Sequence, residues 1–271
     1  MKHILFLLIT MSVLSCKNET KTAVAEQAKT TEKQVENTKN YPEALVKVFD
    51  AHGGLETWNS MQSLTYTQPK EKGNDVTITN LKNRKILVDM PNHAIGYNGE
   101  DVWLLNKGEA QYKGKPKFFY NLMFYFYSMP FIFADDGINY GEAAPLEFEG
   151  VSYPGIKISY NDGVGESSGD EYVLFYNPET YKMEWLGYTV TFFSKGKETA
   201  KGKVKKLNYR RFKDWQNVSG LQLPATMAGY KAEDNVPTEM KNESVFTNVK
   251  VSIEKPDPTL FEVPEGATVV E

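Results

Sequence analysis

The sequence predicts a mainly β protein with a few helices, built as a strongly curved antiparallel sheet or half-open barrel that is lidded by helices. Short segments with an apolar residue at every second position recur along the chain, which is typical of strands with one buried face. Brief turn signals separate these segments and favour antiparallel neighbours. We count about ten to eleven strands, more than an open twisted sheet usually carries without curling.

The first 15 residues have the pattern of a lipoprotein signal peptide. A basic start at Lys2 and His3 precedes an apolar run over residues 4–14, and Cys16 is the only cysteine among the 271 residues. This arrangement resembles a bacterial lipobox, in which the leader is cut before the cysteine and the thiol carries a diacylglycerol. The alternative is an ordinary secretory leader that holds a cysteine by chance.

Residues 16–40 are predicted to be a disordered tether that begins at the lipidated cysteine. Residues 17–39 contain no aromatic residue and carry charges of both signs, so little apolar surface is available to offset the entropy of ordering. Residues 41–271 are predicted to form a single β domain. Because Cys16 would be lipidated, this domain has no disulfide, and its 13% aromatic content must supply a buried core.

An amphipathic helix is predicted at the start of the β domain. Asn40 is a candidate N-cap and Pro42 suits the first turn. Apolar residues from Leu45 to His52 then follow at helical spacing. Gly53-Gly54 predicts the end of the helix, since glycine adopts the left-handed conformation at low cost.

The strands that follow are predicted to bury one face of the sheet. Their apolar rows are Val76/Ile78, Ile86/Val88/Met90, Ile156/Ile158/Tyr160, Tyr188/Val190/Phe192, Leu221/Leu223/Ala225/Met227 and Val245/Thr247/Val249/Val251/Ile253. Turns are predicted at 81–84, 98–99, 107–108, 177–180, 194–197 and 219–220.

An aromatic segment, residues 117–133, interrupts the strands. It is apolar on nearly every side, so periodicity assigns it no solvent face. Pro130 and a length below the ~20 residues of a spanning helix argue against a membrane span. Either the segment lids an apolar hollow at the mouth of the curved sheet, or its aromatic side chains fill a solid core.

Residues suited to catalysis or metal binding are few. His52 lies on the apolar face of the first helix, and His93 has no ligand neighbour at metal spacing. Asp135-Asp136 and the polar loop 161–171 are interpreted as solvated loops, and the common hydrolase and phosphate-binding motifs are missing. No enzyme activity, metal or cofactor is therefore predicted. The net charge of −4, without a basic aromatic patch, makes nucleic acid an unsuitable partner.

Several motifs resemble those of the LolA/LolB-like lipoprotein carrier superfamily. They are the helix exit at 53–58 with the strand start at 63–66, the hairpin at 97–103 and the closing segment at 256–264. Residues 128–131 and 177–181 more narrowly resemble an uncharacterised family of Gram-negative envelope lipoproteins. The resemblance spans about residues 41–265. It implies a half-open barrel whose helices lid an apolar cavity for acyl chains, and it carries over no catalytic residue.

The resulting hypothesis is a membrane-anchored envelope lipoprotein that binds a hydrophobic ligand, a lipid or an acyl chain, in lipoprotein or lipid sorting. The candidate cavity residues are Trp103, Phe118, Phe119, Leu122, Met123, Phe126, Phe131, Trp185, Tyr188 and Phe192. An N-terminal lipid, palmitate included, would hold the chain in the membrane. Lys17, where inner-membrane lipoproteins carry aspartate, favours the outer membrane, on its periplasmic face or at the cell surface. The alternative is a non-enzymatic structural or interaction module of the cell envelope with a solid core, whose exposed loops bind another envelope component. The sequence does not identify a protein partner.

Overall fold

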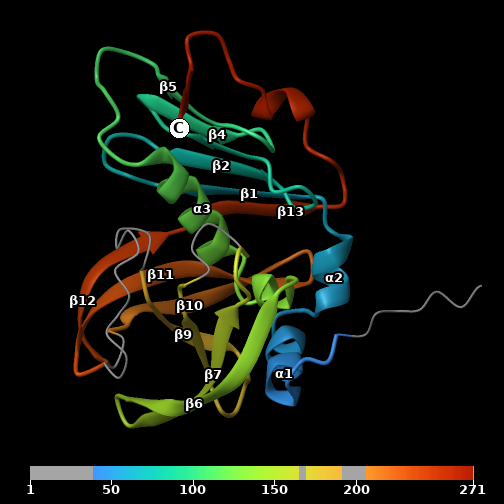
Figure 1. The fold of residues 1–271 in the computed structure, drawn as a ribbon, viewed down its shortest axis with the longest axis vertical. Coiled ribbons are helices and arrows are strands. Elements are labelled where there is room, and N and C mark those ends of the chain that lie inside the picture. The colour runs from blue at the N-terminus through green and yellow to red at the C-terminus, as the bar shows by residue number, and fades with distance from the viewer. Residues whose placement is uncertain (1–38, 165–168, 191–205, 271) are drawn as a thin grey trace, which may run out of the picture. The chain divides into compact units, whose positions relative to one another are not determined.

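Two seven-stranded antiparallel sheets form the fold in the computed structural model, which describes residues 39–164, 169–190 and 206–270 (Figure 1). The first sheet has the order β13 (Thr247–Ser252), β1 (Ser63–Gln68), β2 (Asp75–Asn80), β3 (Ile86–Asp89), β4 (His93–Tyr97), β5 (Val102–Asn106) and β14 (Thr268–Val270). The second has the order β12 (Val236–Val245), β11 (Leu221–Glu233), β10 (Asn208–Val218), β9 (Met183–Tyr188), β8 (Tyr172–Tyr176), β7 (Val151–Tyr160) and β6 (Ile138–Phe148). Both sheets belong to one compact unit, Asn40–Glu271.

The chain passes from one sheet to the other almost without interruption between β12 and β13. Only Phe246 separates the two strands; its amide donates to the carbonyl of Ala225 at 2.8 Å, and its side chain is buried. The sheets are therefore joined along one side and are not closed into a barrel. The predicted fold class, mainly β with a half-open curved arrangement, is confirmed.

The described residues hold fourteen strands, more than the sequence rows indicated. The additional strands include β12, which lies at one edge of the second sheet. Most residues of β12 are exposed, so the strand has no buried face that an alternation of apolar and polar residues would mark.

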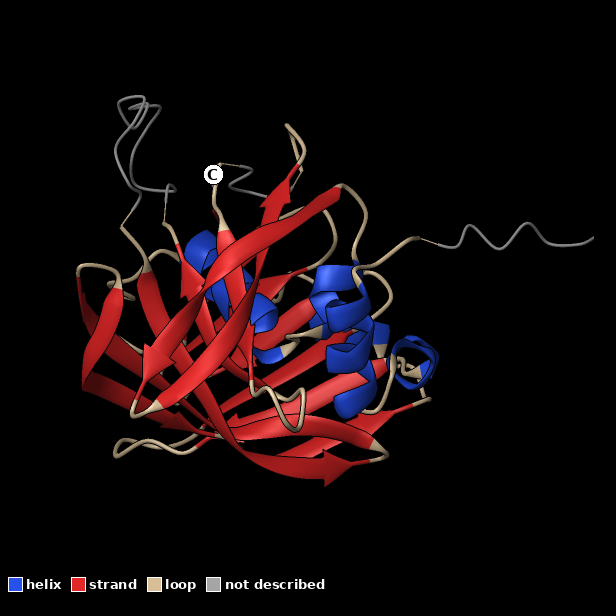
Figure 2. Ribbon diagram, turned by 90° about the horizontal axis from the view of Figure 1, so that it is seen from below, coloured by secondary structure: helices blue, strands red, loops and turns tan. Residues whose placement is uncertain are grey.

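Three α-helices and two short 3-10 turns accompany the sheets. They are α1 (Glu43–Ala51), α2 (Leu55–Ser60), α3 (Pro116–Tyr127), η1 (Phe131–Ala134) and η2 (Pro258–Phe261). Figures 1 and 2 show α3 lying between the two sheets. None of the described helices combines the length and the apolarity that crossing a bilayer requires.

The first helix differs from its prediction at one end and agrees at the other. Asn40 is not its N-cap: the helix begins at Glu43, directly after Pro42, without a side-chain cap. Gly53 does end it, with φ +102°, and a Cβ there would lie 2.2 Å from the carbonyl oxygen of Gly220. The glycine thus serves both the left-handed turn and the close approach of the helix end to the β10–β11 turn.

The second strand buries the face opposite to the one predicted. Thr77 and Thr79 are fully buried, whereas Val76 and Ile78 are half-buried. Thr77 pairs with Tyr66 of β1, whose side chain is directed into the core, and direct cross-strand partners share a face. The alternation was recognised correctly, but the wrong face of β2 was predicted to be buried, because β-branched threonine is tolerated in a core beside tyrosine.

Candidate functional site

A pocket of about 420 Å3 lies between α3 and the strands β7, β8 and β9. Its lining residues come from α3, from the β2–β3 turn, from the segment after η1, from one face of the second sheet and from the loops next to β7, β8 and β9. They are Arg84, Lys117, Phe118, Asn121, Leu122, Tyr125, Asp135, Asp136, Tyr160, Val164, Asp170, Tyr172, Tyr188, Thr189 and Val190.

The helix α3 supplies one wall of the pocket through a single face. Phe118, Leu122 and Tyr125 stand at positions i, i+4 and i+7, which lie above one another on a helix. The opposite face packs on the first sheet, where the ring of Tyr120 stacks on Tyr97 of β4 at a centroid distance of 5.4 Å. A helix without a polar face thus meets the core on one side and the pocket on the other.

Three tyrosines on adjacent strands supply the opposite wall. Tyr172 of β8 pairs directly with Tyr188 of β9, and their rings lie parallel at 6.4 Å. The ring of Tyr160, at the end of β7, meets that of Tyr172 edge-on at 5.8 Å. Burial raises the pKa of Tyr160 and Tyr172 well above the ordinary value, so both hydroxyls stay protonated and can donate hydrogen bonds.

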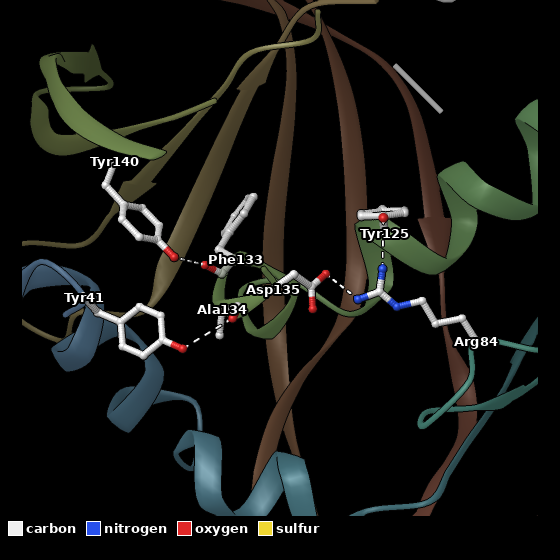
Figure 3. Close-up of polar contacts among 7 residues, drawn as sticks. All are labelled: Tyr41, Arg84, Tyr125, Phe133, Ala134, Asp135 and Tyr140. Carbon is white, nitrogen blue, oxygen red and sulfur yellow. Dashed lines mark hydrogen bonds and ion pairs between the residues drawn. The ribbon is translucent and has the colours of Figure 1, made fainter. Parts of the chain in front are cut away.

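Arg84 forms the charged end of the pocket. One of its terminal nitrogens donates to the hydroxyl of Tyr125 at 3.0 Å, and the other pairs with the carboxylate of Asp135 (Figure 3). Burial disfavours the guanidinium charge, but the negative charge of Asp135 and the contact with Tyr125 raise the pKa of Arg84 above its ordinary value. Arg84 therefore remains a cation at the pocket wall.

The β2–β3 turn directs Arg84 toward the pocket. The carboxamide oxygen of Asn80 accepts from the amide of Lys82 at 3.0 Å, a local arrangement that stabilises such turns. Arg84 then adopts φ +60°, and its amide donates to the carbonyl of Asn80 at 2.8 Å. The turn thus leaves the first sheet with the arginine side chain pointing at α3 and η1 (Figure 3).

Two tyrosine hydroxyls hold η1, the turn that precedes Asp135. Tyr41 donates to the carbonyl of Ala134 at 3.3 Å, and Tyr140 of β6 donates to the carbonyl of Phe133 at 2.5 Å (Figure 3). Together with Arg84, these contacts fix the position of the Asp135 carboxylate from three separate elements.

Of the ten predicted cavity residues, Phe118, Leu122 and Tyr188 line the pocket. Phe192 lies outside the described residues, as do Cys16, the leader and the turn predicted at 194–197. The other six residues lie elsewhere in the described part of the chain.

Trp103 and Trp185 are core residues, away from the pocket. The indole of Trp103 donates to the carbonyl of Phe261 in η2 at 3.1 Å. Trp185 packs in a second cluster with Leu146, Tyr153, Phe175 and Tyr209. Its neighbour Leu186 belongs to the main core, so the two side chains lie on opposite faces of β9.

The other predicted cavity residues of the aromatic segment pack against protein side chains and do not line the pocket. Phe131 stacks on Trp58 of α2 at 4.6 Å, and Phe126 meets the ring of Tyr188 edge-on at 5.1 Å. Phe119 lies 6.5 Å from the ring of Tyr112, and Met123 packs on the main core. The segment therefore fills most of the interior and leaves an open pocket along one helix face only.

Arg84, Tyr125, Tyr160 and Tyr172 are pocket residues that the sequence did not single out, whereas Asp135 was interpreted as a solvated loop residue and instead pairs with Arg84 at the pocket. Tyr160 was part of a predicted apolar row, and its hydroxyl was the feature of the sequence that could have marked it as a pocket residue. Within the described ranges, no group of three or more His, Cys, Asp or Glu side chains is arranged to hold a metal ion.

Comparison with known proteins assigns the chain to a family. The model of a family of unknown function, DUF6503, matches residues 2–222. The chain belongs to the DUF6503 family. None of the curated proteins matches its sequence.

Three solved structures similar to this DUF6503 chain have sequence identities of 10% or 11% to it. A LolA superfamily protein from Nitrosomonas europaea has 11% identity and a TM-score of 0.42, with 77% of this chain and 95% of that chain covered. A DUF1329 family protein from Desulfovibrio piger has 11% identity and a TM-score of 0.45, with 82% and 98% covered. A Vibrio parahaemolyticus domain named as an outer membrane lipoprotein-sorting protein has 10% identity and a TM-score of 0.37, with 78% and 97% covered.

Proposed function

We propose that this DUF6503 protein binds a hydrophobic molecule, a lipid or an acyl chain, in the pocket between α3 and β7–β9. The observation that carries the proposal is the pocket itself, about 420 Å3 with aromatic side chains on two facing walls. This volume lies within the ~300–1,000 Å3 range of small-molecule sites. The proposed role is binding, and no step of catalysis belongs to it.

Burial of apolar surface would supply the affinity. Phe118 and Leu122 face the rings of Tyr172 and Tyr188 across the pocket, and an alkyl chain between them loses its contact with water. At ~25 cal/mol per Å2, a chain that buries a few hundred Å2 gains several kcal/mol before the costs of binding.

The second candidate function is a structural or interaction module in which the aromatic segment fills a solid core. Tyr127, Phe131 and Phe133 are fully buried among other protein side chains. An interaction module would need only this packing, and it would leave the pocket without a ligand. The two candidates therefore differ in whether a molecule co-purifies with the protein.

The Leu122→Trp variant is expected to lose the bound molecule because an indole at this position occupies the pocket. The full chain is purified from membranes and extracted with organic solvent, and the extract is analysed by mass spectrometry. Leu260→Trp is the matched control, since Leu260 lies exposed in η2, outside the pocket lining. Both variants keep the same N-terminus, so any lipid attached there contributes equally to both extracts. Equal amounts of each species in wild type and Leu122→Trp would refute the proposal.

We further propose that the protein is an envelope lipoprotein, anchored through Cys16 in the outer membrane. Residues 1–15 would be the signal peptide, residues 16–40 the tether and residues 41–271 the binding domain. The support is the apolar run over residues 4–14 directly before the only cysteine.

Mass spectrometry of the N-terminal peptide from membrane-extracted protein is expected to show a lipopeptide that begins at Cys16. Its mass should exceed that of the bare peptide by a diacylglycerol and an additional acyl group. An unmodified Cys16 thiol, or a mature terminus at another residue, would rule out this anchor.

A further inference from the structure

The guanidinium of Arg84 has N–H groups at the pocket wall that donate to no described residue. An arginine carries five N–H groups, and Arg84 uses one toward Tyr125 and one toward Asp135. The other three have no acceptor among the described residues. The Arg84 side chain is 39% exposed and lines the pocket, so these donors are accessible to a ligand.

The hydroxyls of Tyr160 and Tyr172 are further donors of the same kind. Neither bonds another group in the described part of the chain, although both residues line the pocket. Each remains protonated because burial raises its pKa. These hydroxyls lie on the strand wall, opposite Tyr125 on the helix.

Two of the three carboxylates that line the pocket already accept a hydrogen bond from another protein group. The carboxylate of Asp135 accepts from Arg84, and that of Asp170 accepts from the hydroxyl of Thr189 at 3.1 Å. Asp136 and Lys117 also line the pocket and carry opposite charges. The pocket donors that have no described acceptor are the remaining N–H groups of Arg84 and the hydroxyls of Tyr160 and Tyr172, and these can serve a ligand.

Arg84 and the apolar lining residues contact different parts of α3. Phe118 and Tyr125 are seven residues apart, about 10 Å along the helix axis at 1.5 Å per residue. Arg84 binds Tyr125, whereas Phe118 and Leu122 line the other part of the pocket, beside Lys117. A ligand that contacts both Arg84 and these apolar side chains is amphipathic.

We propose that the ligand is a long-chain oxyanion, a carboxylate or a phosphate monoester, whose head accepts hydrogen bonds from Arg84, Tyr160 and Tyr172. The alkyl chain lies along Phe118 and Leu122. This inference rests on the proposed binding function and makes Arg84 the residue that selects the head group. Charge-assisted hydrogen bonds to a guanidinium are stronger than neutral ones, so the acid is preferred over its ester.

Native mass spectrometry of the solubilised full chain, titrated with 16-carbon ligands, tests this selection. Hexadecanoate and hexadecyl phosphate are expected to bind at least about 10-fold more tightly than methyl hexadecanoate. Arg84→Gln should weaken the two anions by about 10- to 100-fold and leave the ester unchanged. Acetate and inorganic phosphate should bind far more weakly than either long-chain anion.

Tyr172→Phe provides a test that does not depend on the structural contacts of Arg84. It removes a hydroxyl without a described protein partner, so the fold is retained while the anions lose about 2- to 10-fold in affinity. Tyr209→Phe is the control: its hydroxyl donates to the carbonyl of Asn235, its ring packs in the second cluster away from the pocket, and its acid-to-ester ratio should equal that of wild type.

Each remaining outcome contradicts a distinct claim. Equal binding of acid and ester by wild type, or an unchanged ratio in both Arg84→Gln and Tyr172→Phe, overturns the head-group assignment and leaves the binding function standing. Acetate or phosphate binding as tightly as the 16-carbon anions overturns the role of the alkyl chain. No binding of any 16-carbon ligand overturns the proposed function itself.

Discussion

Phe131→Ala should lower the free energy of unfolding by about 3–5 kcal/mol, the usual cost of removing a buried aromatic ring. Phe131 is 1% exposed and stacks on Trp58 at 4.6 Å with an interplanar angle of 8°. Its ring also meets His52 edge-on at 6.4 Å, so the truncation leaves a cavity between η1 and the first two helices. Urea unfolding followed by tryptophan fluorescence measures the loss.

Phe118→Ala is the matched control within the same aromatic segment. Phe118 is half-buried on the pocket wall, so its removal should cost no more than about 1.5 kcal/mol of stability. The same variant should instead retain less of the molecule that co-purifies with the protein. Equal losses of stability in the two variants would show that both rings belong to one packed core, contrary to the division of the segment described above.

Lowering the pH from 6.5 to 4 is expected to remove about 3 kcal/mol of stability through His52 alone. His52 is fully buried at the end of α1, and burial lowers its pKa from 6.5 to about 4. The bond from its Nδ1 to the carbonyl of Val48, at 2.7 Å, opposes this shift, and the positive charge of Lys182 adds to it. The histidine is therefore neutral in the folded protein at pH values where the unfolded chain protonates it.

The sign of the effect follows from the proton count. Between pH 6.5 and 4 the unfolded chain binds a proton that the folded chain does not, so stability falls as the pH falls. Urea unfolding at several pH values in this window should show a steeper decline for wild type than for His52→Phe, which cannot titrate. Parallel declines in the two proteins would mean that His52 is charged in the fold or makes no contribution.

The curved sheet could be predicted from the sequence because period-two alternation is a local signal. The rows Ile86/Val88 and Leu221/Leu223 are buried as expected. Gly53 was recognised as a helix stop from its type alone, because few other residues adopt a positive φ at low cost. The face of β2 was predicted wrongly, since the burial of Thr77 depends on Tyr66 in the neighbouring strand.

The pocket could be predicted only in part. Phe118 and Leu122 were chosen because the aromatic segment has no polar face, but the same argument included Phe131, which packs against Trp58. Elements that are distant in sequence determine which face of such a helix lines the pocket. Arg84 and Asp135 lie 51 positions apart, and no local pattern links a turn arginine to an aspartate beyond the aromatic segment.

The two faces of α3 separate two kinds of evolutionary constraint within one helix. Under the proposed binding function, changes at Phe118, Leu122 or Asn121 would alter which ligand the pocket accepts, while the packing of Tyr120 and Tyr127 on the first sheet stays intact. New ligand preferences could then arise by substitution on one face of α3 without loss of folding. Among members of the DUF6503 family, we expect sequence diversity to concentrate on this face wherever the ligand differs.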